Sequence, residues 1–204
     1  MPTAIDKRYE AVLYHEQSWA KAVSFTAMRA KPLTVWEVLI PIFIIFNHMR
    51  LKGAREVFAQ NLLFTKKLAL DAALAMTKNG QIKSQAMSHL EEKTKGLLAS
   101  VKDGIYSEPI RQKQLEEIRL LIDHYCRLLQ AEGDDYATLV AHSYDNLSQY
   151  KSFLEELKGA EGEVNRAAVK TLGSQADTET LSRIETASHS MRLESAQKIF
   201  QTIQ

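Results

Sequence analysis

The chain has 204 residues, of which 45% are hydrophobic and 25% are charged, and this length and composition suffice for a buried hydrophobic core. A formal net charge of +1 provides no basic footprint for nucleic acid, and a single cysteine, Cys126, excludes an intramolecular disulfide. The net charge of +1 conceals an uneven distribution of charge along the chain. Residues 1–80 carry 11 Lys and Arg against 6 Asp and Glu, whereas residues 81–204 carry 15 against 19.

The N-terminal part predicts two long helices on either side of an apolar segment. Apolar residues recur at three- and four-residue steps from Thr3 to about residue 30, and Thr3 and Asp6 have the spacing of a capping box. Pro32 ends this helix, because a residue before proline avoids the α conformation. A second helix is expected over residues 54–78, with Asn79-Gly80 at its end, since glycine suits a left-handed cap.

The rest of the chain also shows helical periodicity, and no stretch alternates polar and apolar residues as a strand would. Helices are expected over residues 82–102, 107–131, 134–158, 161–172 and 177–203, separated in part by Gly104, Gly133, Gly159 and Gly173. The sequence therefore predicts an all-α helical bundle of long amphipathic helices with a short apolar membrane-associating segment near the N-terminus. We divide it into a basic helical region (1–80, with the apolar segment 33–49), a helical bundle (81–175) and a C-terminal amphipathic helix or tail (176–204).

The apolar segment, residues 33–49, allows three interpretations. A spanning helix needs about 20 apolar residues, and this segment is shorter and contains Glu37, Pro41 and Asn47. A buried core helix is the usual explanation of a short apolar run, but a helix without a polar face must be enclosed on all sides. The third interpretation is monotopic insertion into one leaflet.

Monotopic insertion also explains the positive charge. Pro41 favours a kink, and basic residues at both ends suit a segment that enters and leaves by the same anionic, cytoplasmic face. The predicted membrane contacts are Trp36, Val38, Leu39, Ile40, Pro41, Ile42, Phe43, Ile44, Ile45 and Phe46. The predicted contacts to anionic lipid are Arg29, Lys31, Arg50, Lys52 and Arg55.

No catalytic pattern is found in the sequence. Glu-x-x-His motifs and glycine-rich phosphate loops do not occur, and the histidines are never closer than 18 residues apart. His124 and Cys126 are two residues apart on a predicted helix, so their side chains point to different sides. We therefore expect no enzyme activity, no cofactor and no metal.

The sequence favours a non-enzymatic, peripheral or monotopic protein on the cytoplasmic face of a membrane. In this interpretation the helical part acts as a scaffold or binds a protein partner of unknown identity, and nucleic acid is not a partner. The alternative is a soluble cytoplasmic helical adaptor in which residues 33–49 are buried as core or as a partner interface.

Overall fold

The structure is a computed structural model that describes residues 2–27, 54–100, 106–176 and 178–202. These residues form α-helices and one short 3₁₀ helix, with no strand among them, so the predicted all-α fold is confirmed. The elements are α1 (Ala4–Ala27), α2 (Ala54–Asn79), α3 (Lys83–Ser100), α4 (Glu108–Gln130), α5 (Tyr136–Ser143), α6 (Leu147–Leu172), η3 (Gly173–Gln175) and α7 (Thr178–Thr202). Within the described part, no helix combines the length and apolar character needed to cross a bilayer.

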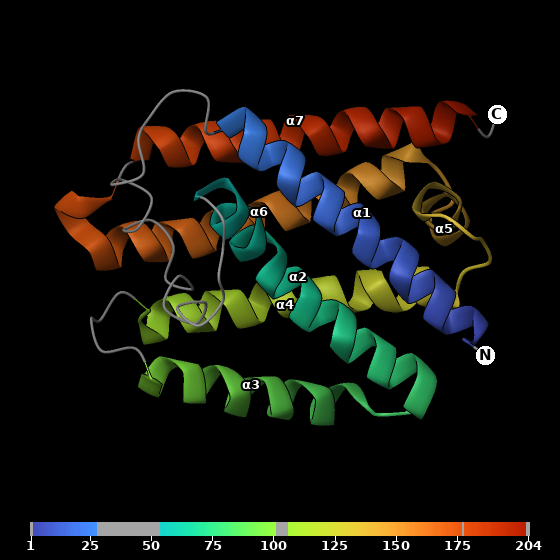
Figure 1. The fold of residues 1–204 in the computed structure, drawn as a ribbon, viewed down its shortest axis with the longest axis horizontal. Helices are drawn as coiled ribbons and strands as arrows, with labels where there is room; N and C mark the ends of the chain where they lie inside the picture. Colours follow the sequence, from blue (N-terminus) through green and yellow to red (C-terminus); the bar gives the residue numbers. More distant parts are fainter. Residues whose placement is uncertain (1, 28–53, 101–105, 177, 203–204) are drawn as a thin grey trace.

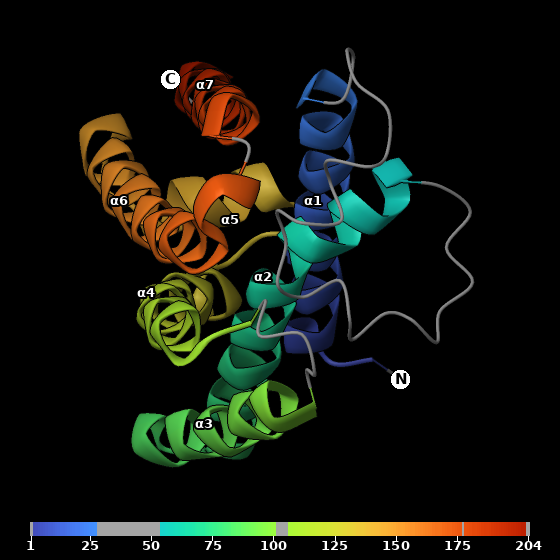
Figure 2. The same cartoon turned by 90° about the vertical axis from the view of Figure 1, so that its left-hand side faces the viewer.

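The long helices form two layers. In Figure 1, α7, α6, α4 and α3 lie roughly side by side from top to bottom, and successive helices run in opposite directions. The helices α1 and α2 form the second layer and cross the first obliquely, as Figure 2 shows from the side. The short α5 lies near one end of the bundle, where it packs against α1, α4 and α7.

Local sequence explains several helix boundaries. At the start of α1, the backbone N–H of Thr3 donates to Asp6 Oδ2 (2.9 Å) and the N–H of Asp6 donates to Thr3 Oγ1 (3.3 Å), which confirms the predicted capping box. The helix α2 ends at Asn79, and Gly80 follows with φ = +68°, a left-handed conformation that favours glycine. Ser107 precedes the first residue of α4, as predicted.

The predicted break at Gly159 is wrong. Helix α6 runs without interruption through Gly159, and its start lies after Asn146, whose side chain accepts a hydrogen bond from the N–H of Gln149 (3.0 Å). A glycine inside a helix costs only about 1 kcal/mol relative to alanine. Burial of side chains on both sides of it, such as Leu157 and Ala168, outweighs that cost.

Helix α4 lies at the centre of the core and contacts α1, α2, α3, α5 and α6. The apolar stripe predicted for it is buried throughout: Ile110, Leu115, Ile118, Leu121, Ile122, Tyr125, Leu128 and Leu129. All of these except Ile110 belong to the main hydrophobic cluster, which also includes Val12 of α1, Leu70 of α2 and Ile199 of α7, so residues from all three predicted regions share it. Helix α7 is therefore a member of the bundle. The boundaries of the three regions stay a prediction.

Candidate functional site

Most of the predicted membrane-contact residues lie outside the described part of the chain. These are Trp36, the run from Val38 to Phe46, and Arg29, Lys31, Arg50 and Lys52. Arg55 is described and lies exposed in the first turn of α2.

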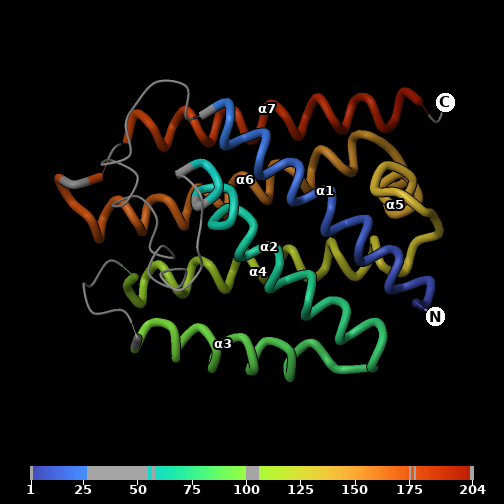
Figure 3. The backbone as a smooth tube through the Cα atoms, in the orientation of Figure 1, coloured from blue at the N-terminus to red at the C-terminus, as the bar shows by residue number. Residues whose placement is uncertain are grey.

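Arg55 lies near the point where the described part of the chain resumes after residue 27. Its guanidinium lies 4.9 Å from the centroid of the Phe25 ring, near the end of α1. Figure 3 shows the end of α1 and the start of α2 at the same end of the bundle, with the two helices running in opposite directions. The contact between Arg55 and Phe25 joins the start of α2 to the end of α1, so the two flanks of the apolar segment are neighbours in space.

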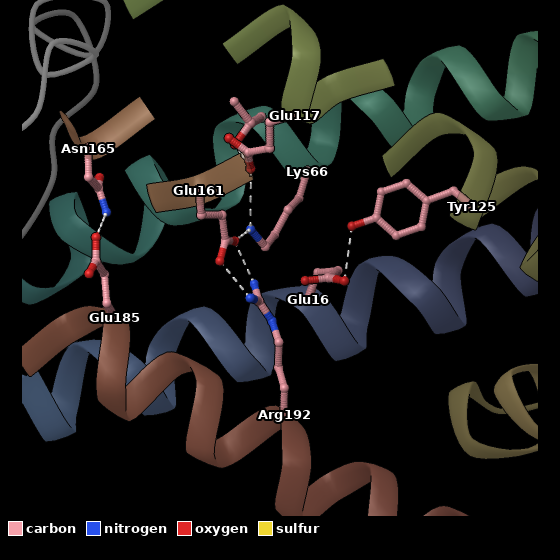
Figure 4. Close-up of polar contacts among 9 residues, drawn as sticks. Glu16, Lys66, Glu117, Tyr125, Glu161, Asn165, Glu185 and Arg192 are labelled. Carbon is pink, nitrogen blue, oxygen red and sulfur yellow. Dashed lines mark hydrogen bonds and ion pairs between the residues drawn. The ribbon is translucent and has the colours of Figure 1, made fainter. Parts of the chain in front are cut away.

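A second feature was not predicted from the sequence. Five charged side chains meet inside the protein between α1, α2, α4, α6 and α7 (Figure 4): Glu16, Lys66, Glu117, Glu161 and Arg192. We call this group the buried ion cluster. Four of its side chains are at least nine-tenths buried, and Glu161 is 22% exposed.

Glu161 is the carboxylate with the most complete pairing in the buried ion cluster. Arg192 donates from Nη1 to Oε2 and from Nη2 to Oε1 of Glu161, both at 2.7 Å, which is the bidentate geometry of a strong ion pair. Lys66 Nζ donates to Glu161 Oε1 at 3.1 Å. The guanidinium of Arg192 and the ammonium of Lys66 also lie 4.3 Å and 4.8 Å from the Trp19 ring centroid.

The other two carboxylates have weaker partners. Glu16 accepts a hydrogen bond from Tyr125 Oη at 3.0 Å, and Glu117 accepts one from Thr65 Oγ1 at 3.3 Å. Lys66 Nζ is 4.0 Å from Glu117 Oε1, beyond hydrogen-bond distance. Glu117 is thus a buried carboxylate whose cationic partner, Lys66, is shared with Glu161 and lies closer to Glu161.

The surroundings of Glu117 and Glu161 shift the pKa values of their carboxyl groups in opposite directions. Burial raises the pKa of Glu117 from 4.5 to about 7, against the attraction of Lys66. Burial also opposes ionisation of Glu161, but Arg192 and Lys66 prevail and lower the pKa of that carboxyl. At neutral pH the cluster therefore holds an ionised Glu161 beside a carboxyl group that is poised to gain or lose a proton.

A cavity of about 130 Å³ lies beside the buried ion cluster. Its wall includes Trp19, Phe58, Asn61, Lys66, Glu117 and Ile184. On its partly exposed side, Asn165 Nδ2 donates to Glu185 Oε1 at 2.7 Å and links α6 to α7 (Figure 4).

Two polar side chains in the cavity wall are buried without a hydrogen-bond partner in the described part of the chain. Asn61 is 5% exposed, and neither its Nδ2 nor its Oδ1 has a partner there. The Nε1 of Trp19 is in the same situation. Buried polar groups of this kind cost about 1–3 kcal/mol each when they are unpaired.

The sequence did contain a signal for the cluster. Lys66 lies three residues after Leu63 and four before Leu70, both of which are buried on the same face of α2. Glu117 lies four residues before the buried Leu121 on α4. A charged residue in an apolar stripe indicates that the helix buries a polar group, although it does not show which helix supplies the partner.

The remaining reactive groups are less suited to catalysis. His124 is buried with Nδ1 2.7 Å from Tyr144 Oη, and burial lowers its pKa to about 3, which keeps the ring neutral. Burial raises the pKa of the Cys126 thiol and so disfavours the nucleophilic thiolate. Among the described residues, no group of three or more His, Cys, Asp or Glu side chains is placed to hold a metal ion.

The pairing of Glu161 limits the part that this carboxylate could take in proton transfer. Two carboxyl groups with separated pKa values are a pattern of acid–base catalysis, but both oxygens of Glu161 already accept hydrogen bonds from Arg192 and Lys66. Comparisons with protein-family models, with curated proteins and with solved structures give no match.

Proposed function

We propose that the protein is a non-enzymatic helical bundle held on the cytoplasmic face of a membrane by monotopic insertion of residues 33–49, and that the bundle binds a protein partner as a scaffold. The observation that carries this proposal is the contact between Phe25 and Arg55. A single straight crossing would separate the two flanks of the segment by about 30 Å of hydrocarbon. Flanks in contact argue against a spanning segment and agree with one that leaves and re-enters on one side.

The charge of the flanks supports the same arrangement. Residues 29–67 carry seven Lys and Arg against two Glu, and one of the seven, Lys66, lies in the buried ion cluster and does not face a surface. Each basic residue near an anionic surface contributes about 1 kcal/mol of attraction. Arg55 is exposed beside Phe25 at the start of α2 and is therefore accessible to such a surface. The alternative, a soluble adaptor with residues 33–49 buried in the core or in a partner interface, predicts no membrane attachment.

Charged substitutions in the apolar run separate the two hypotheses. We expect Ile42→Asp combined with Ile45→Asp to move the protein from the membrane fraction to the soluble fraction, because two carboxylates cost about 5 kcal/mol or more in hydrocarbon. The helical content measured by circular dichroism should stay unchanged. Wild-type protein should be released from membranes by detergent and not by high salt.

A matched control places the same charges elsewhere. Tyr14 and Ile82 are exposed large hydrophobic residues, at 73% and 58% exposure, on the described surface. A protein that carries both Tyr14→Asp and Ile82→Asp should stay in the membrane fraction, as the wild type is expected to do. If the Ile42 and Ile45 substitutions instead abolish the circular dichroism signal of the whole protein, those side chains are core and the membrane proposal fails.

A further inference from the structure

The buried ion cluster holds more negative than positive charge. Among the described residues it contains three carboxylates and two cations. Arg192 gives both terminal nitrogens to Glu161, and Lys66 lies closer to Glu161 (3.1 Å) than to Glu117 (4.0 Å). An additional cation beside Glu117 would therefore share that carboxylate with the more distant Lys66, in a site of low dielectric constant where attraction is strong.

The unpaired atoms of the cavity wall also indicate which hydrogen-bonding groups a ligand would carry. Asn61 Oδ1 is an unpaired acceptor, whereas Asn61 Nδ2 and Trp19 Nε1 are unpaired donors. An ammonium group can donate to Glu117 and to Asn61 Oδ1 together, since it carries three N–H bonds. The two donors call for an uncharged oxygen that accepts hydrogen bonds, such as a hydroxyl.

The size and walls of the cavity limit the ligand. Its volume of about 130 Å³ is near that of the ~150 Å³ cavity that accepts one benzene molecule in an engineered protein. Phe58 and Ile184 supply apolar wall opposite the polar groups. A ligand of about six non-hydrogen atoms with a short aliphatic chain matches this space.

We propose that this cavity binds a small amino alcohol, with its ammonium group held by Glu117 and Asn61 and its hydroxyl group facing the donors Asn61 Nδ2 and Trp19 Nε1. The groups that face Glu117 are Thr65 and Lys66 from α2, Glu161 from α6 and Arg192 from α7. Binding of the cation stabilises the ionised form of Glu117, so the protein releases a proton when the ligand binds near neutral pH. This inference does not depend on membrane attachment.

Binding of a ligand in this cavity can be measured by the fluorescence of Trp19. The chain has two tryptophans, so Trp36→Phe leaves Trp19 as the sole tryptophan of the full-length protein. In this background, titration with 4-amino-1-butanol should change the fluorescence of Trp19 in a saturable manner. The same titration with 1,4-butanediol, which lacks the charge, and with 4-hydroxybutyrate, which reverses it, should give an affinity at least 10-fold weaker.

Substitutions assign the response to the cavity. Glu117→Gln keeps the size of the side chain and removes the charge, and we expect it to weaken 4-amino-1-butanol binding about 10-fold or more. Asn61→Leu should weaken it by a similar factor. Glu116→Gln is the matched control, because Glu116 is exposed and pairs with Lys113 at the surface, and it should bind as wild type.

Three results would overturn the proposal. They are the absence of a saturable response in Trp19 fluorescence, equal binding of 1,4-butanediol and 4-amino-1-butanol, and unchanged affinity in a folded Glu117→Gln protein. Phosphoethanolamine tests the other source of an ammonium group, the headgroup of a phospholipid. Its phosphate would meet Glu161 and Glu185, so we expect it not to bind; binding as tight as that of the amino alcohol would also overturn the proposal.

Discussion

Replacing Arg192 with methionine is expected to lower the free energy of unfolding by about 3–5 kcal/mol at pH 7, because it leaves buried carboxylates without their main cation. Arg192 holds both oxygens of Glu161 at 2.7 Å and lies over the ring of Trp19. Methionine preserves most of the apolar packing of the arginine stem, so the loss reports on the charge. Urea denaturation followed by circular dichroism measures it.

Arg166 on α6 provides the matched control. It pairs with Glu163 at 2.6 Å, but its side chain is 67% exposed. Exposed pairs contribute about 0–1 kcal/mol, so Arg166→Met should change the free energy of unfolding little. Adding Glu161→Gln to Arg192→Met should recover part of the lost stability, since the orphaned charge is removed. Equal effects of Arg192→Met and Arg166→Met would contradict the role given to the buried ion cluster.

The second large effect is a change in how stability depends on pH. Burial raises the pKa of Glu117 from 4.5 to about 7. Between these values the folded protein keeps a proton that the unfolded chain has lost, so stability from this group is present below pH 4.5 and is lost as the pH rises to about 7. Glu117→Gln stays neutral and should be more stable than wild type above pH 7, by about 3 kcal/mol.

The comparison between wild type and the Glu117→Gln protein separates the effect of Glu117 from that of other titrating groups. Burial lowers the pKa of His124, which makes stability rise with pH in part of the same range, but this contribution is common to both proteins. The lowered pKa of Glu161 changes the stability of the protein only below pH 4.5, the ordinary pKa of a glutamate. Unfolding is therefore measured from pH 5 to 8. A stability difference that stays constant over that range would show that Glu117 does not titrate there. Glu116→Gln should give a constant difference near zero.

The parts of the fold that follow from local chemistry could be predicted from the sequence. The capping box of Thr3 and Asp6, the left-handed Gly80 and the buried stripe of α4 each depend on residues within a few positions of one another. The break assigned to Gly159 failed for a tertiary reason, because the packing of α6 overrides the weak helix propensity of one glycine.

The buried ion cluster and its cavity could not be located in the same way. Lys66 and Glu161 are 95 positions apart, and only the packing of α2 against the other layer brings them together. A charge in an apolar stripe shows that a helix buries a polar group, but it does not show which helix supplies the partner. The size of the cavity depends on how side chains from five helices pack, which periodicity does not encode.

The most direct test of monotopic attachment is the accessibility of single cysteines on the two sides of residues 33–49. Ala4 at the start of α1 and Ser174 in η3 are both exposed, and Cys126→Ala removes the only native thiol. Ala4→Cys and Ser174→Cys proteins in that background are treated with a membrane-impermeant thiol reagent on sealed right-side-out vesicles. The proposal predicts that both sites are protected until the vesicles are lysed. Labelling of Ala4→Cys alone before lysis would establish a spanning segment and contradict it.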